Sequence, residues 1–206
     1  AAISVYTEIK NIKLLKKVSS LNRGTKKKKK MILKILKSGI KPTVIFHDLY
    51  LNNGNSQYSQ IDLVVATKVG IVVFEIKEYA GWIFGNENQR NWTQILAYGK
   101  RKYQFYNPIL QNKKHIDDLK KFHHFDGIPF FSVIVFFGNC EFKNSLILPK
   151  RTFLTKSFKV MDRFNEILQN NQPIKYDNKW EIANLLKQAV RNGEDSLILE
   201  KQTKVI

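Results

Sequence analysis

The sequence contains few acidic residues, one cysteine and no long apolar run. Asp and Glu number 17 among 206 residues, against 35 Lys and Arg, which leaves a formal net charge of +18. Cys140 stands alone, and this excludes a disulfide within the chain and a zinc site built from several cysteines. No apolar stretch approaches the roughly 20 residues of a membrane-spanning helix, and no signal peptide is visible. We therefore expect no integral membrane segment in this chain and a cytoplasmic location. The chain does not begin with Met, so the earlier removal of an anchor stays open.

Motifs of several enzyme classes are also missing. The sequence has no Gly-rich phosphate-binding loop, and it offers no persuasive Ser-His-Asp or Cys-His spacing for nucleophilic catalysis. His123 and His124 are adjacent, but no further zinc ligands lie near them in the sequence.

The residues that are present predict a folded and strongly basic protein. Hydrophobic residues make up 43% and aromatic residues 12% of the chain, enough for a sizeable core. Residues 1–41 carry 13 of the basic residues and a single acid, Glu8. Such an excess implies a polyanionic partner, with nucleic acid as the first expectation and an anionic membrane surface as the second.

The apolar pattern predicts an α/β fold whose elements run helix, three strands, helix, strand, followed by C-terminal helices. Helices are expected at 3–18, 25–37, 108–124, 158–169 and 178–192, and strands at 43–48, 61–67, 70–77, 80–85, 129–137 and 145–148. Residues 92–106 give no clear pattern. We expect a mixed central sheet flanked by helices. The expected domains are a basic amphipathic extension at 1–20, a core at 21–150 and a mostly helical extension at 151–206 that packs on the core.

Two acidic residues interrupt apolar runs that are typical of central strands. Asp62 lies in the run 60–66, and Glu75 lies in the run 70–77. Strand alternation puts Glu75 and Lys77 on the same face. Because an unpaired buried carboxylate is costly, each acid needs a cation or strong hydrogen-bond donors. Two such acids on neighbouring strands indicate a divalent-metal site suited to phosphodiester hydrolysis, or else a structural pair that Lys77 bridges.

Several motifs in this order resemble the PD-(D/E)XK nuclease superfamily and, within it, the nuclease-related domain family (NERD). The matching segments are Gln60-Ile61-Asp62, Gly70-Ile71-Val72-Val73-Phe74-Glu75-Ile76-Lys77, Gly81-Trp82-Ile83-Phe84-Gly85, Trp92 and Asn107-Pro108-Ile109-Leu110-Gln111. They cover about half the chain. The resemblance implies a restriction-endonuclease-like core of order α-β-β-β-α-β and metal-dependent hydrolysis, of DNA rather than RNA.

The resemblance also implies a role for individual residues. Asp62 and Glu75, with the carbonyl of Ile76, would bind Mg²⁺ or Mn²⁺. Lys77 would orient the attacking water or offset charge in the transition state. Gln111, in the first turn of its helix, would position the water or a phosphate. An ordinary polar residue in a helical first turn is the alternative for Gln111, and Gln60 is a weaker candidate for the same site.

The first helix departs from the family pattern. Members usually have Gly-x-x-Gly-Glu there, with the Glu facing the metal, whereas here Lys28 occupies the position of that acid. The change leaves two possibilities beside an ordinary nuclease: a site with one metal instead of two, or a nucleic-acid-binding module that has lost turnover.

A run of five lysines, Lys26, Lys27, Lys28, Lys29 and Lys30, begins this helix and follows Arg23. Like charges four residues apart, and positive charge at a helix N-terminus, both destabilise the helix. Because a phosphate backbone would relieve both effects, we expect these six residues to bind nucleic acid, the alternative being a solvated helix end. Aromatic residues of the middle region, including Trp82, Trp92, Tyr103, Phe105 and Tyr106, either stack on bases or belong to the core.

Overall fold

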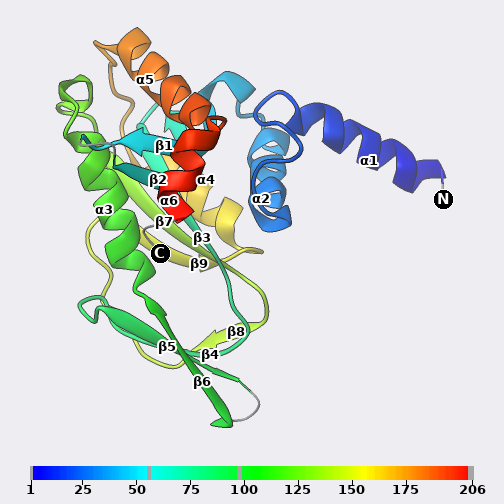
Figure 1. Ribbon diagram of the computed structural model, residues 1–206, viewed down its shortest axis with the longest axis vertical. Coiled ribbons are helices and arrows are strands. Elements are labelled where there is room, and N and C mark those ends of the chain that lie inside the picture. Colours follow the sequence, from blue (N-terminus) through cyan, green and yellow to red (C-terminus); the bar gives the residue numbers. More distant parts are fainter. Residues whose placement is uncertain (1, 55–56, 97–98, 204–206) are drawn as a thin grey trace.

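The computed structural model describes residues 2–54, 57–96 and 99–203 (Figure 1). The chain forms two sheets with helices around the larger one. The helices are α1 (Ala2–Leu15), α2 (Lys26–Lys37), α3 (Pro108–Lys120), α4 (Val160–Asn170), α5 (Lys179–Asn192) and α6 (Ser196–Thr203), with 3₁₀ turns at Pro42–Val44 and His123–Phe125. None of the helices in these ranges is both long and apolar enough to cross a bilayer.

The larger sheet has the strand order β1-β2-β3-β7-β9. Its strands are β1 (Ile45–Asn52), β2 (Tyr58–Thr67), β3 (Gly70–Glu78), β7 (Phe130–Phe137) and β9 (Thr152–Lys156). The first three form an antiparallel meander, whereas β7 runs parallel to both β3 and β9. The expected α/β fold, with a mixed central sheet, flanking helices and C-terminal helices, is confirmed.

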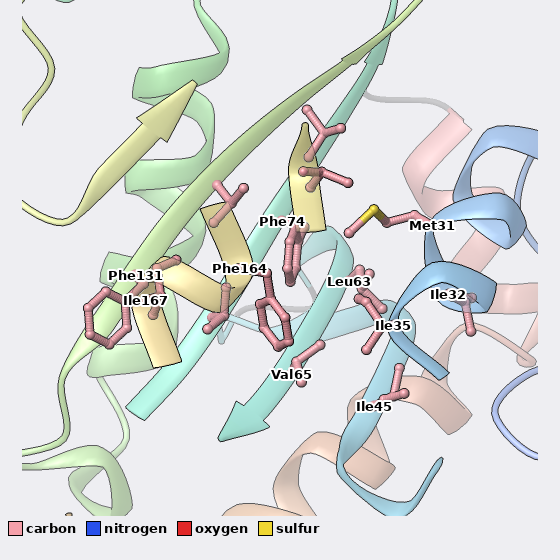
Figure 2. Packing of buried hydrophobic residues seen from close by; sticks show 14 of the residues in the cluster. Met31, Ile32, Ile35, Ile45, Leu63, Val65, Phe74, Phe131, Phe164 and Ile167 are labelled. Carbon is pink, nitrogen blue, oxygen red and sulfur yellow. The ribbon is translucent and has the colours of Figure 1, made fainter. Parts of the chain in front are cut away.

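Both faces of this sheet are covered by helices, because strand alternation sends apolar side chains to each side. On one face, Val72 and Phe74 of β3 pack with apolar residues of α2 and α4. Figure 2 shows Phe74 among the side chains of this cluster. On the other face, Ile71 and Val73 pack with residues of α3 and α5. The helices α4 and α5 therefore share one core with the elements of residues 21–150, and so does β9, which lies beyond residue 150.

The start of α2 is fixed by its flanking residues. Thr25 is the N-cap, and its side chain accepts a hydrogen bond from the amide of Lys28. Gly24 has a φ of +69°, and a Cβ atom at this position would lie 2.5 Å from the ring of His47. Glycine is therefore required at position 24 for two reasons, the positive φ and the close approach to β1. The turn at Gly24 brings the first residues of α2 close to the sheet, where Lys28 reaches Asp62 of β2.

The start of α3 is fixed in the same way. Asn107 is the N-cap, accepts a hydrogen bond from the amide of Ile109 at 2.9 Å, and is followed by Pro108. Its amide nitrogen also donates to three carbonyls of the loop 86–89. Asn107 thus joins the helix to the preceding loop, and Gln111 falls in the first turn as expected.

The smaller sheet has the order β6-β5-β4-β8 and lies at the lower end of the molecule in Figure 1. Its strands are β4 (Gly81–Phe84), β5 (Asn91–Leu96), β6 (Arg101–Tyr106) and β8 (Cys140–Phe142). The antiparallel pair of β5 and β6 occupies the region whose sequence gave no clear pattern. One face of the sheet packs through Ile83, Trp92 and Phe105 against Phe136 of β7.

The strand expected at 145–148 is wrong. This segment is not a strand, and the chain passes through it between β8 and β9. Leu146 and Leu148 alternate because both pack, half-buried, against the apolar cluster under the smaller sheet. The alternation thus reflects burial without strand pairing. The turn expected at 52–56 includes Asn55 and Ser56, which lie outside the described residues.

Candidate functional site

Asp62 on β2 and Glu75 on β3 lie opposite each other in the larger sheet. The antiparallel register pairs Leu63 with Phe74, and one further step places Asp62 across from Glu75 with both side chains on one face. The two residues are 8% and 3% exposed, respectively. The structure therefore brings together the two carboxylates that the sequence singled out, in a largely buried position where each needs a partner.

The partner of Asp62 is Lys28. The ammonium Nζ lies 2.5 Å from Asp62 Oδ1, and the side chain of Lys28 is 15% exposed. The other carboxylate oxygen, Oδ2, accepts a hydrogen bond of 2.8 Å from the amide of Ile76. Burial and the charge of Glu75 raise the pKa of Asp62, and Lys28 and the Ile76 amide oppose that shift. Burial also lowers the pKa of Lys28, but the adjacent Asp62 outweighs it and raises the pKa above its ordinary value.

Glu75 is held by Lys77 and His115. Its Oε1 lies 2.8 Å from Lys77 Nζ, and its Oε2 lies 3.5 Å from His115 Nε2. Burial raises the pKa of Glu75, but His115 and Lys77 outweigh burial and lower the pKa below its usual range. Glu75 is therefore the more firmly ionised of the two acids.

The helix α3 supplies the remaining side chains. Lys77 Nζ donates to Gln111 Oε1 at 2.8 Å, so Gln111 joins the site from the first turn of α3. His115, one turn later, is buried on the same side of the helix. The sequence analysis missed His115, although its spacing of four residues from Gln111 is a signal that could have found it.

The six basic residues expected to contact nucleic acid have different environments. Lys26 and Lys30 are exposed. Lys27 Nζ is 3.1 Å from Glu78 Oε1, and Lys29 Nζ donates to the carbonyl of Leu21. Lys28 points to Asp62, so the five lysines do not form one uniform phosphate-binding strip.

Arg23 is buried, and its guanidinium has several partners within the protein. It is 9% exposed, and its guanidinium binds the carboxylate and carbonyl of Asp48 and the carbonyl of Val190. Whether Arg23 also contacts nucleic acid stays a prediction, and the groups it binds in this structure all belong to the protein. Because a fork of donors satisfies both an acid and a backbone carbonyl, Arg23 connects the approach to α2 with β1 and the end of α5.

Asp48 extends the row of acids to a third strand. It lies between the pairs His47–Leu63 and Leu49–Ile61, across from Asp62, with a φ of +56°. Its Oδ1 accepts a hydrogen bond of 2.8 Å from the side-chain amide of Gln60. Gln60, the weaker candidate for the site, is thus bound to Asp48. Asp48, Asp62 and Glu75 each have a basic partner of their own. In the described part of the chain, no three acidic, histidine or cysteine side chains are arranged to hold a metal ion.

The aromatic residues separate into core and surface. Trp92 is 1% exposed and Phe105 is half-buried, so both belong to the core. Trp82, Tyr103 and Tyr106 are 37%, 47% and 43% exposed, respectively. The register places Trp82 in one row with Ile95 and Lys102, on the face of the smaller sheet that points away from the core, and Lys143 Nζ lies 4.9 Å above the ring of Trp82.

The donor set fits one divalent cation. Asp62 Oδ1 and Glu75 Oε1 are carboxylate oxygens, the ligands that Mg²⁺ and Mn²⁺ prefer, and their present partners are both lysine side chains. Asp48, the third acid of the row, is held by Arg23, and Lys28 contributes an ammonium group and no oxygen ligand. A single ion would find two carboxylate ligands here, and its remaining ligands would be a backbone carbonyl and water.

Two comparisons with known proteins found similar sequences. Residues 22–137, more than half of the chain, match the family model described as the nuclease-related domain. An uncharacterized protein of Bacillus anthracis is 32% identical over 120 residues, which is 58% of this chain and 54% of that protein. The chain thus spans about half the length of this relative. No solved structure matches the chain.

Proposed function

The chain belongs to the nuclease-related domain family, within the PD-(D/E)XK-like superfamily, and from this premise we propose that it is a metal-dependent nuclease that hydrolyses phosphodiester bonds, with DNA as the substrate. The observation that carries the proposal is the cluster of Asp62, Glu75, Lys77 and Gln111, from three separate elements. A cluster of buried charged groups around two facing carboxylates costs folding free energy because the charges lose their hydration. Such clusters are typical of functional sites, catalytic sites among them.

Asp62, Glu75 and the carbonyl of Ile76 would hold one Mg²⁺ or Mn²⁺ ion. When bound, the ion supplies a Lewis acid that polarises the scissile phosphate and lowers the pKa of a water molecule. Ile76 also contributes through its amide, whose hydrogen bond fixes the orientation of the Asp62 carboxylate.

Lys77 is the proposed catalytic cation. Its Nζ lies 2.8 Å from both Glu75 Oε1 and Gln111 Oε1, so two side chains fix its position before substrate arrives. An ammonium held in this way stabilises negative charge that develops on the phosphate, without reorganisation during the reaction. Gln111 accepts from Lys77 through its oxygen, which leaves its amide nitrogen free to orient a water or a phosphate oxygen. His115 positions Glu75.

Two surfaces are proposed to contact nucleic acid. Lys26 and Lys30 lie four residues apart, so they share the exposed face of α2 and suit successive phosphates. The second surface is the outer face of the smaller sheet, defined by Trp82, Lys102 and Tyr106. Exposed rings beside ammonium groups are typical of surfaces that stack the bases of single strands. The sheet is joined directly to the site, because β4 follows Lys77 and β6 precedes Gln111.

One observation favours a second candidate function, a nucleic-acid-binding module without turnover. Lys28 occupies the place of an acid that would face the metal, and it forms an ion pair with Asp62. In this alternative the two lysines stabilise the carboxylates permanently, and the basic surface alone is functional.

The two candidates differ in a cleavage assay. Purified protein is incubated with circular and with linear DNA in Mg²⁺, Mn²⁺ or EDTA, and the products are separated by electrophoresis. Metal-dependent cleavage that EDTA abolishes supports the nuclease. Binding of DNA without cleavage in either metal supports the module. Cleavage of circular DNA also identifies an endonuclease, because a circle has no end.

A further inference from the structure

We propose that the ammonium group of Lys28 is a tethered cation that occupies Asp62 in place of a metal ion, so that a divalent cation binds this carboxylate only after Lys28 has left it. The inference rests on the proposed function, because it takes Asp62 and Glu75 as the metal ligands. It assigns Lys28 a role in controlling the site that is separate from phosphate binding.

The geometry of Asp62 is the first support. Both of its oxygens have partners: Oδ2 accepts from the Ile76 amide at 2.8 Å, and Oδ1 lies 2.5 Å from Lys28 Nζ. The Ile76 amide belongs to β3 and cannot leave without disturbing the sheet. Lys28 is bound only through a flexible side chain, so Oδ1 is the oxygen that can be released to a metal.

The position of Lys28 on α2 is the second support. The residue lies in the first turn, where Thr25 caps the helix, and the helix is anchored by the buried side chains of Met31, Ile32 and Ile35. The helix backbone can therefore stay in place while the side chain of Lys28 moves. This side chain is 15% exposed, so part of it already reaches solvent.

The charges of the site give the third support. Two carboxylates, Asp62 and Glu75, are matched by two ammonium groups, Lys28 and Lys77. A divalent cation bound to Asp62 Oδ1 would come within a few ångströms of Lys28 if the lysine stayed, and the two cations would repel each other in a poorly solvated site. Lys28 and the metal are therefore competitors for one oxygen. Removal of Lys28 without a metal leaves two carboxylates facing each other, which strengthens the attraction for a cation.

The other lysines of the run do not share this role. Lys27 and Lys29 have partners outside the site, and Lys26 and Lys30 are exposed. The contrast provides matched controls on the same helix. Lys37, exposed in the last turn of α2, allows the same change of charge and side-chain length far from Asp62.

The test measures binding of Mn²⁺ alone, by isothermal titration calorimetry on the full chain. Four proteins are compared: wild type, Lys28→Met, Lys28→Glu and the control Lys37→Met. Methionine keeps helix propensity and much of the side-chain length while removing the charge. We expect Lys28→Met to bind Mn²⁺ at least about tenfold more tightly than wild type, and Lys28→Glu more tightly still, because it adds an oxygen ligand. Lys37→Met should match wild type.

The thermal midpoint in EDTA is the second readout. Lys28→Met should melt at a lower temperature than wild type in EDTA, and saturating Mn²⁺ should raise its midpoint more than that of wild type. Equal Mn²⁺ affinities in wild type and Lys28→Met, or no Mn²⁺ binding by folded Lys28→Met, would overturn the proposal. If wild type cleaves DNA in Mn²⁺ while wild type and Lys28→Met bind Mn²⁺ equally well, the proposal for Lys28 is wrong and the proposed nuclease function still holds. Tighter binding by Lys28→Met without cleavage by wild type would support it and refute the nuclease.

Discussion

Lys77 Nζ lies 2.8 Å from Glu75 Oε1 on its own strand and 2.8 Å from Gln111 Oε1 on α3. The strand and the helix thus hold one ammonium group between a carboxylate and an amide. This contact joins two motifs that are separated in the sequence by three strands of the smaller sheet, β4, β5 and β6. It also explains why the helix start at Asn107 matters to a site on β3.

Replacing Lys77 tests its catalytic role. Lys77→Ala should lower the cleavage rate by at least about a hundredfold, the scale of a lost transition-state donor. DNA affinity in EDTA should stay nearly unchanged, because Lys77 is held inside the site. Single-turnover rates and fluorescence anisotropy measure the two quantities. Equal losses in rate and affinity would instead make Lys77 a phosphate contact of the ground state.

The salt dependence of DNA binding tests the exposed lysines of α2. Each lysine that contacts a duplex phosphate contributes about −0.9 to the slope of log affinity against log salt. Lys26→Gln with Lys30→Gln should therefore reduce the magnitude of the slope by about 2, without changing sequence preference. The matched control is Lys37→Gln with Lys41→Gln, two exposed lysines outside the run. A slope that changes equally in both double variants would show a general charge effect.

The outer face of the smaller sheet predicts binding of single strands. The double variant Trp82→Ala, Tyr106→Ala should weaken affinity for a single-stranded oligonucleotide by about 1–3 kcal/mol for each base that loses the aromatic side chain on which it stacks. Anisotropy in EDTA measures the effect in the absence of cleavage. Trp180→Ala is the control, because Trp180 is 75% exposed on α5. Equal affinities of wild type and the double variant would exclude base stacking on this face.

His47 predicts a pH dependence of stability. Burial lowers the pKa of this histidine from 6.5 to about 4, and the nearby charges of Lys28, Arg23 and Lys29 act in the same direction, against that of Asp48. Between pH 6.5 and pH 4, His47 binds a proton in the unfolded chain but stays neutral in the folded chain. The free energy of unfolding therefore falls as the pH drops towards 4. The difference corresponds to roughly 3 kcal/mol.

Chemical denaturation at pH 4.5 and pH 7 measures this effect. His47→Asn, which keeps a polar group near Ser19, should flatten the dependence between these two values. A variant as sensitive to pH as wild type in this range would mean that other groups cause the loss of stability.

Much of the site could be predicted from the sequence because its residues lie on regular elements. Strand alternation placed Glu75 with Lys77, and the Asn-Pro helix start placed Gln111 in a first turn. Both rules act over a few residues, so a local pattern is sufficient. The order of the motifs identified the family, and the position of Asp62 and Glu75 in two neighbouring strands predicted that they come together.

The rest depended on contacts between distant segments. The pairing of Lys28 with Asp62 and the burial of Arg23 against Asp48 follow from where α2 approaches the sheet. A basic run has no periodicity that marks one lysine as internal. The hairpin at 91–106 was missed because its outer face carries exposed aromatic and basic residues in place of a simple alternation.

The most direct test of the central claim is the rate at which supercoiled DNA is nicked as the Mn²⁺ concentration is raised. Wild type is compared with Asp62→Asn and Glu75→Gln, which keep the shape of the two side chains and remove their charge. The account predicts nicking by wild type that saturates with Mn²⁺ and stops in EDTA, and a loss of at least about a hundredfold in each variant, the scale of a lost group that stabilises the transition state. Nicking by the variants at the wild-type rate, or nicking by wild type that persists in EDTA, would contradict it.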